Sequence, residues 1–329
     1  MMKKQHSFTG RLLLLSGVAA IMSMSCFFAP PGMGNEGVST VDSGSNNTSD
    51  EKNTDTTDKT DKSSGDEKST ENKTGEEKEE VEDPSLGIIE KNGLTLVWND
   101  EFDYEGVPDT SKWKYQTGAG GWGNNELQKY ISNTEEADTA LVSDGILTIK
   151  AYKDGNTWKS ARMNSKASWK YGYIEARMKI TDRKGAWPAF WMMPQDSVYG
   201  EWPKSGEIDI MENAPSTCGV HKVFSTLHAE GHSGGEGQSI GAKVFGEELA
   251  EEWHSIGVLW TEDTITSYYD GKARGFYEND GTTKNWPYDK DFYIILNLAI
   301  GGNLGGPKSD VATLNEEAEF QIDYVRVYQ

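Results

Sequence analysis

Apolar and polar residues alternate along much of the chain after residue 93. Seven segments show this pattern: 94–98, 146–152, 173–180, 255–260, 264–270, 292–298 and 320–328. Because successive side chains of a strand point to opposite faces, each segment predicts a β-strand with one buried face. The repeated pattern therefore predicts a strand-rich domain.

Turn signals separate these predicted strands. Asp-Gly pairs, which favour tight turns because both residues tolerate left-handed backbone angles, occur at 144–145, 154–155, 270–271 and 280–281. The helix candidate of note is the short stretch 246–252. Many strands with Gly-rich turns, and no regular alternation with helices, predict an all-β fold, either a sandwich or a barrel.

Composition divides the chain into three parts. Residues 33–85 contain no aromatic residue and carry 16 acidic residues against six lysines. Such a segment cannot bury enough apolar surface to fold, so it predicts a disordered acidic linker. Residues 86–329 hold all 11 Trp and all 14 Tyr, and are expected to form the folded domain. The formal net charge of -21 argues against a nucleic-acid binder, which needs a basic surface.

Residues 1–32 resemble an export signal. Lys3, Lys4 and Arg11 form a basic start, and the apolar run 12–22 is too short to span a bilayer. The end of the segment resembles a bacterial lipobox and predicts lipidation at Cys26, with ordinary cleavage and release as the alternative. We therefore expect an exported protein, lipid-anchored at the bacterial cell surface or in the periplasm, or otherwise secreted.

Three acidic residues lie close together between 207 and 212. Glu207 and Asp209 are two apart, so they share one face of a strand, while the isoleucines beside them enter the core. Glu212 is five residues from Glu207, and in a regular strand it would face the other way. One bulged residue near Met211 would bring it back to the acidic face, and bulges concentrate next to active sites.

Three carboxylates on one face repel each other, which favours a catalytic role. A retaining glycosidase needs one carboxylate as nucleophile and a second, protonated carboxyl as acid, about 5–5.5 Å apart. A calcium site and a solvated acidic strand face are the alternatives. Trp187, Trp191 and Trp202 come shortly before the three acids, and exposed tryptophans stack on sugar rings. The alternative for each of these tryptophans is a place in the core.

Residues 207–213 resemble the E-x-D-x-x-E signature of glycoside hydrolase family 16, in its laminarinase-like, bulged form. Six further segments match in the expected order: 98–102, 121–130, 171–177, 187–194, 295–302 and 323–328. The resemblance covers about residues 94–329. It implies a concanavalin-like β-jelly roll, a sandwich of two antiparallel sheets with one concave face that forms the substrate cleft.

The resemblance also implies roles for single residues. Glu207 would be the nucleophile, Glu212 the acid/base, and Asp209 would assist Glu207. The matching substrate-contacting positions are Asn124, Arg162, Trp187, Trp191, Trp202 and His228.

No cofactor is expected for catalysis, but the resemblance implies a structural calcium. The matching positions are Glu101, Gly145 and Asp323. His228 and His232 are four residues apart without a third ligand in the sequence, and predict no zinc site.

The function implied is a retaining endo-β-glucanase that hydrolyses β-1,3-glucan. Mixed-linkage β-1,3-1,4-glucan is the second substrate, galactans come third, and a non-catalytic lectin on the same fold is the non-enzyme alternative. The expected partners are a β-glucan polysaccharide and, through the lipid anchor, a membrane. We expect a monomer.

Overall fold

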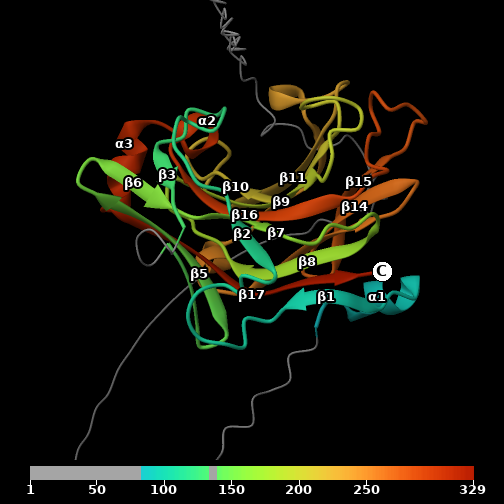
Figure 1. Ribbon diagram of the computed structural model, residues 1–329, viewed down its shortest axis with the longest axis horizontal. Helices are drawn as coiled ribbons and strands as arrows, with labels where there is room; N and C mark the ends of the chain where they lie inside the picture. Colours follow the sequence, from blue (N-terminus) through green and yellow to red (C-terminus); the bar gives the residue numbers. More distant parts are fainter. Residues whose placement is uncertain (1–82, 133–138) are drawn as a thin grey trace, which may run out of the picture. The chain divides into compact units, whose positions relative to one another are not determined.

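The computed structural model describes residues 83–132 and 139–329. The signal region, Cys26 and residues 33–82 of the expected linker lie outside the described residues. Two β-sheets pack face to face in Figure 1, and one apolar core with contributions from both sheets fills the space between them. The expected sandwich of two sheets is therefore confirmed.

The larger sheet has ten strands in the order β15-β14-β13-β8-β17-β5-β6-β3, with β1 beside β17 and β4 beside β5. All pairs in it are antiparallel except β3 with β6. Its strands are β1 (Leu96–Asp100), β3 (Gln128–Tyr130), β4 (Ala140–Ser143), β5 (Ile146–Asp154), β6 (Thr157–Ser160), β8 (Gly172–Lys179), β13 (His254–Trp260), β14 (Thr264–Tyr269), β15 (Lys272–Glu278) and β17 (Glu317–Tyr328).

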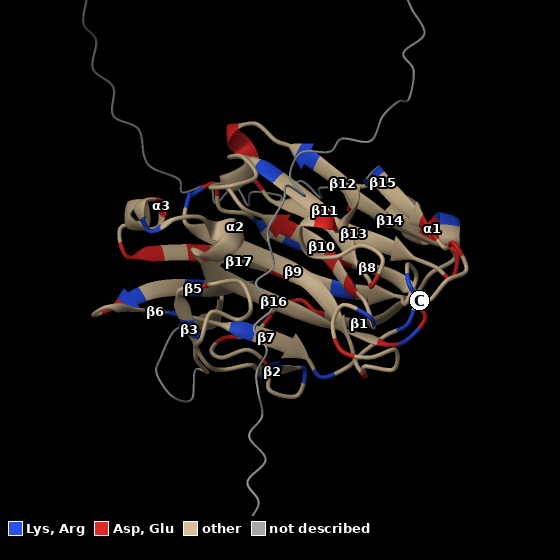
Figure 2. Ribbon diagram, turned by 90° about the horizontal axis from the view of Figure 1, so that it is seen from above, with Lys and Arg blue, Asp and Glu red and all other residues tan. Residues whose placement is uncertain are grey.

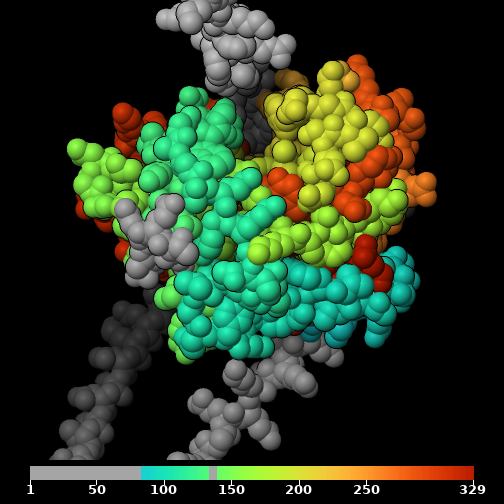
Figure 3. Space-filling view, viewed as in Figure 1, coloured from blue at the N-terminus to red at the C-terminus, as the bar shows by residue number. Residues whose placement is uncertain are grey.

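The smaller sheet has seven strands in the order β12-β11-β10-β9-β16-β7-β2. Figure 2 shows them in this order from one edge of the sheet to the other. Its strands are β2 (Trp113–Tyr115), β7 (Arg162–Ser165), β9 (Ala186–Pro194), β10 (Glu207–Asn213), β11 (Lys222–His228), β12 (Gln238–Val244) and β16 (Phe292–Ile300). The three acidic residues lie on β10, so this sheet carries the site. In Figure 3 the surface above it is hollowed between the teal and the yellow segments.

All seven strands expected from alternation are present, as β1, β5, β8, β13, β14, β16 and β17. Two of the Asp-Gly pairs form tight turns with positive φ at both residues, at Asp144-Gly145 between β4 and β5 and at Asp270-Gly271 between β14 and β15. The pair Asp280-Gly281 instead lies in the longer loop between β15 and β16.

Helical structure in the described residues is short. The helices are α1 (Leu86–Asn92), α2 (Gly302–Gly305), α3 (Lys308–Val311) and the 3-10 turns η1 (Gly234–Glu236), η2 (Glu247–Ala250) and η3 (Ala312–Leu314). The expected helix at 246–252 is thus a single 3-10 turn. Among the described residues, no helix is long and apolar enough to cross a membrane.

The folded unit begins before the expected boundary at residue 86. Arg326 on β17 donates a hydrogen bond to Asp83 (2.8 Å), and the buried Ser85 hydroxyl lies 2.9 Å from the Glu175 carboxyl on β8. Residues 83–85 are therefore part of the sandwich, and helix α1 follows directly from them.

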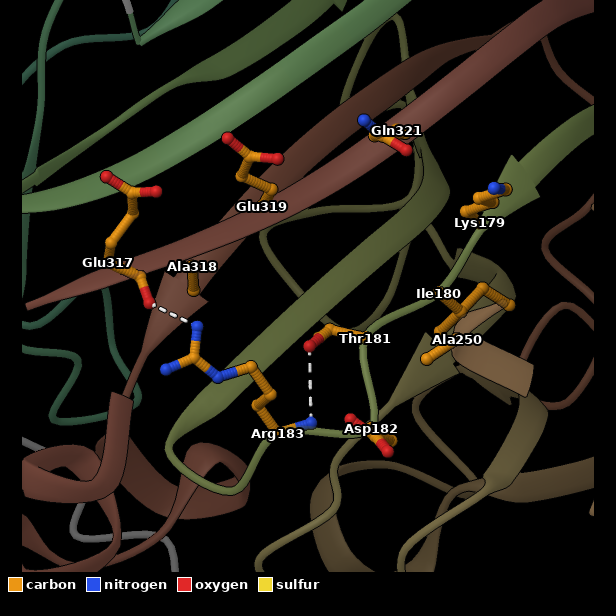
Figure 4. Close-up of a pocket in the computed structure, with 10 residues that line it drawn as sticks. All are labelled: Lys179, Ile180, Thr181, Asp182, Arg183, Ala250, Glu317, Ala318, Glu319 and Gln321. Carbon is orange, nitrogen blue, oxygen red and sulfur yellow. Dashed lines mark hydrogen bonds between the residues drawn. The ribbon is translucent and has the colours of Figure 1, made fainter. Parts of the chain in front are cut away.

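A polar pocket of about 280 Å³ lies on the ten-stranded sheet, at the end of β8 and the start of β17 (Figure 4). Arg183 spans it, donating hydrogen bonds to the carbonyl oxygens of Glu317 (2.8 Å) and Leu314. Because its guanidinium group donates to backbone carbonyls there, Arg183 stabilises the start of β17. The pocket belongs to a different sheet from the acidic residues.

Candidate active site

A bulge in β10 brings the three carboxyl groups to one face. Asp209 pairs with Trp191 of β9, and Met211 pairs with the preceding residue, Phe190, so Ile210 is the extra residue. Ile210 and Met211 are both fully buried. Because the bulge shifts the alternation by one residue, Glu212 joins Glu207 and Asp209. The expected bulge is confirmed, one residue before the expected position.

Glu212 is a buried residue of β10. Its side chain is 8% exposed, and the indole N–H of Trp187 donates a hydrogen bond to Oε1 (3.1 Å). Burial raises the pKa of Glu212 well above its ordinary value, and the negative charge of Asp209 raises it further. A raised pKa favours the protonated form of the carboxyl group, which is the form that a general acid requires.

The Trp187 hydrogen bond predicts a shift of the pH–activity profile. An N–H donor stabilises the carboxylate form, so it lowers the pKa of Glu212. Replacing it by Trp187→Phe removes the donor and raises the pKa of Glu212. We expect the alkaline limb of kcat/KM to move to higher pH, measured on soluble glucan from pH 5 to 10. Trp158→Phe, a buried tryptophan of the other sheet, is the matched control; an equal shift there would contradict the assignment.

Glu207 and Asp209 form an interacting pair. The indole N–H of Trp202 donates to Glu207 Oε2 at 2.5 Å, and Trp202 itself is 50% exposed. Asp209 is 3% exposed, and its carboxyl shares a hydrogen bond with that of Glu207. Burial, with the charge of Glu207, raises the pKa of Asp209 well above its ordinary value. A raised pKa favours the protonated form of Asp209, which can donate this hydrogen bond to the Glu207 carboxyl group.

His228 enters the site from the neighbouring strand. It lies opposite Glu207 in the β10–β11 register, and its Nε2 is 3.0 Å from Asp209 Oδ2. Of the expected substrate positions, His228 and Trp202 therefore lie beside the acids. Trp187 also lies there, but it is buried and holds Glu212, so its ring face is not open to a sugar.

Arg162 and Trp191 form a second group on the same sheet. Arg162 on β7 stacks between two indole rings, 4.6 Å from the centroid of Trp191 and 4.9 Å from that of Trp122. The Trp191 N–H donates to Asn297 Oδ1 on β16 (2.7 Å). The structure thus brings together the two expected residues and adds Trp122 and Asn297.

A hydrogen-bonded chain continues from this group to the loop before β3. Asn297 donates to the Tyr130 hydroxyl (3.0 Å), which donates to the buried Glu126 (3.2 Å). Asn124, another expected substrate position, lies in the same loop and is held to Asn303 of α2 through its backbone carbonyl (2.8 Å). Glu126 and Tyr130 lie in segment 121–130, which resembles glycoside hydrolase family 16 in sequence and thereby pointed to this loop.

The expected calcium positions all belong to the ten-stranded sheet or to its turns. Asp323 lies in β17. Glu101 directly follows Asp100, the last residue of β1, which pairs with Val325 of β17. Gly145 lies in the β4–β5 turn, two residues before Leu147, which pairs with Ile322 of β17. Arg326 donates to both carboxylate oxygens of Glu101, so only the backbone carbonyl of Glu101 would be available to an ion. Arg177 binds Asp323 Oδ2 (2.6 Å). The donor set is all oxygen, which fits calcium.

Residues 96–329 match the family described as "Beta-porphyranase A-D, GH16 domain". The chain belongs to glycoside hydrolase family 16. It is therefore a glycoside hydrolase, and the three carboxyl groups on β10 match the acidic signature of this family.

Family 16 relatives agree with this assignment. The chain is 39% identical to glucan endo-1,3-beta-glucosidase A1 of Niallia circulans, over 72% of this chain and 38% of that protein. It is 37% identical to the beta-glucanase of Rhodothermus marinus, over 71% of this chain and 85% of that protein. The X-ray structure of the laminarinase from Rhodothermus marinus superposes with a TM-score of 0.64 at 34% identity, covering 72% of this chain and 97% of that one. The chain thus spans little more than a third of the first relative's length.

Proposed function

We propose that this family 16 member is a retaining endo-β-glucanase that hydrolyses β-1,3-glucan of the laminarin type. One observation carries the proposal: Glu207, Asp209 and Glu212 share one face of β10, where Glu212 is buried and its pKa is raised. The relatives named for β-1,3-glucan support the substrate class. Mixed-linkage β-1,3-1,4-glucan is the alternative substrate.

The reaction proceeds in two displacements. Protonated Glu212 gives its proton to the glycosidic oxygen while the bond from the anomeric carbon to that oxygen breaks. The Glu207 carboxylate forms a bond to the same carbon and gives a glycosyl-enzyme. Glu212, now a carboxylate, takes a proton from a water molecule, whose oxygen attacks the anomeric carbon and releases Glu207.

The aromatic groups at the site suit a polysaccharide. The exposed ring of Trp202 lies beside Glu207, and the Trp122–Arg162–Trp191 stack lies further along the same sheet. Aromatic faces bind the C–H faces of sugar rings, so two such groups on one sheet fit a chain of sugar units.

The substrate test compares polysaccharides side by side, with products sized. The full chain is incubated with laminarin, barley mixed-linkage glucan and a porphyran-type galactan, with Glu207→Gln as the blank. We expect fastest release of oligosaccharides from laminarin. Faster cleavage of mixed-linkage glucan would select the alternative, and faster cleavage of the galactan would exclude a glucanase. Binding without new reducing ends would favour the lectin.

We also propose that the protein is exported and lipid-anchored through Cys26. The basic start, the short apolar run and the lipobox-like end of the signal region support this proposal. Growth with a radioactive fatty acid should label the wild-type chain and leave Cys26→Ala unlabelled. An unlabelled wild-type chain found in the medium would support cleavage and release instead.

A structural calcium at Glu101, Gly145 and Asp323 is a further proposal. Calcium would bind the folded state only, so saturating calcium should stabilise the protein by roughly 2–4 kcal/mol. The measurement is a thermal melt of metal-free protein with calcium or with magnesium added. We expect Tm to rise with calcium alone, and to rise less in Asp323→Asn. A Tm that calcium leaves unchanged would contradict the site.

A further inference from the structure

Two carboxylates and one histidine converge at the catalytic end of β10. In the part of the chain that the structure describes, Glu207, Asp209 and His228 each place a ligand atom within 4.8 Å of the other two. Glu207 and Asp209 are two residues apart on one strand, and His228 is the cross-strand partner of Glu207. The sheet therefore places two carboxylates beside His228, in a group that does not include His232.

The contact between Asp209 and His228 has the geometry of two ligands. His228 Nε2 and Asp209 Oδ2 are 3.0 Å apart, within ion-pair distance, but the buried Oδ2 accepts no hydrogen bond of good geometry. Two atoms that bind one tetrahedral zinc ion at about 2.0–2.1 Å lie about 3.3 Å from each other. The observed pair is close to that separation, and among the described residues the buried Oδ2 has no ion-pair partner other than His228.

The His228 ring is held in this position from several sides. A Cβ atom at Gly237 would lie 2.6 Å from His228 Cε1, so only glycine fits against this edge of the ring. Trp202 packs nearby, with ring centroids 6.1 Å apart, and the Tyr288 hydroxyl donates to the His228 carbonyl oxygen (2.9 Å). A ligand that is fixed before the ion arrives loses little entropy on binding.

We infer that Glu207, Asp209 and His228 form a binding site for a divalent ion of the zinc and copper class. The set of one imidazole nitrogen and two carboxylate oxygens suits these borderline ions, whereas calcium and magnesium prefer oxygen ligands alone. Three protein ligands leave a fourth position open to water. The site is distinct from the proposed calcium position, which lies on the other sheet.

Metal at this site blocks the glucanase reaction. The ion occupies the carboxylate of Glu207, which must be free to attack the anomeric carbon. It also binds Asp209, the group that shares a hydrogen bond with Glu207. This inhibition rests on the proposed function, but binding of the ion does not, so the two are measured separately.

Zinc binding is tested by calorimetry on the untagged full chain, in a non-chelating buffer at pH 7 with excess calcium present. We expect one zinc ion per chain. His228→Gln should weaken the affinity at least about tenfold, since even the partners of metal ligands contribute about 10–100-fold. His232→Gln is the matched control, because His232 is four residues away and outside the group. It should bind zinc like the wild type.

Two further measurements keep the site testable if His228→Gln folds poorly. Asp209→Asn should also weaken zinc binding, and X-ray absorption of the zinc-bound wild type should show one imidazole with oxygen ligands. Equal zinc affinity in the wild type and both variants, or loss of binding in His232→Gln alone, would overturn the site.

The inhibition is tested on laminarin hydrolysis. Zinc should inhibit the wild type, a chelator should restore activity, and oligosaccharide products should weaken zinc binding by competition. Zinc bound at the site without any inhibition would overturn the blocking role. A chain that binds zinc but cleaves no polysaccharide at all would instead overturn the proposed function and leave the metal site standing.

Discussion

Glu212→Gln is expected to lower kcat on β-glucan by about 10²–10⁴-fold, the usual contribution of a positioned general acid. The amide keeps the shape of the side chain and can still contact Trp187, so the fold should be retained. Glu207→Gln should lower kcat by on the order of 10⁴-fold or more, because the nucleophile is lost. The measurement is release of reducing ends from laminarin, with circular dichroism as the folding check.

The leaving group separates the two roles. An aryl β-glucoside with an acidic phenol needs no protonation when it leaves, so it should recover the first step in Glu212→Gln but not in Glu207→Gln. Glu319→Gln is the matched control, since Glu319 lies exposed on β17 of the other sheet. A fully active Glu207→Gln would end the catalytic assignment.

Glu175→Gln is expected to reduce the change in the free energy of unfolding between pH 4.5 and pH 8 by about 3 kcal/mol. Glu175 lies on β8, is 0% exposed and contacts the Ser85 hydroxyl (2.9 Å). Burial raises its pKa from 4.5 to about 7, and the negative charge of Asp83 adds to the effect. Between pH 4.5 and about 7, the folded state therefore keeps a proton that the unfolded chain has already released.

The direction of this effect follows from proton binding. The stabilisation is complete below pH 4.5 and is lost as the pH rises to about 7, because the native state binds the extra proton over this range. Urea unfolding of the wild type and Glu175→Gln at pH 4.5 and pH 8 measures it. The variant should gain stability relative to the wild type at pH 8, whereas Glu319→Gln should show no such change. An equal difference at both pH values would contradict the buried, protonated Glu175.

The sequence predicted the strands whose side chains alternate visibly and missed strands whose burial does not alternate. Strands such as β5 and β17 have one face in the core over many residues, so their alternation is visible. Strand β9 is buried along nearly its whole length, and the edge strand β15 is largely exposed, so neither shows a clear period of two. Helix α1 has seven residues, too few for a helical period to be recognised.

For the site, the sequence determined which carboxyl groups share a face. The spacing of Glu207, Asp209 and Glu212 and the period of a strand are local properties, and the bulge followed from them. Only the tertiary structure decided the partners of these groups. Trp187 reaches Glu212 from β9, and His228 reaches Asp209 from β11. Such contacts depend on strand order and register, which are set by packing between residues far apart in the chain, and burial in that packing is what raises the pKa of Glu212.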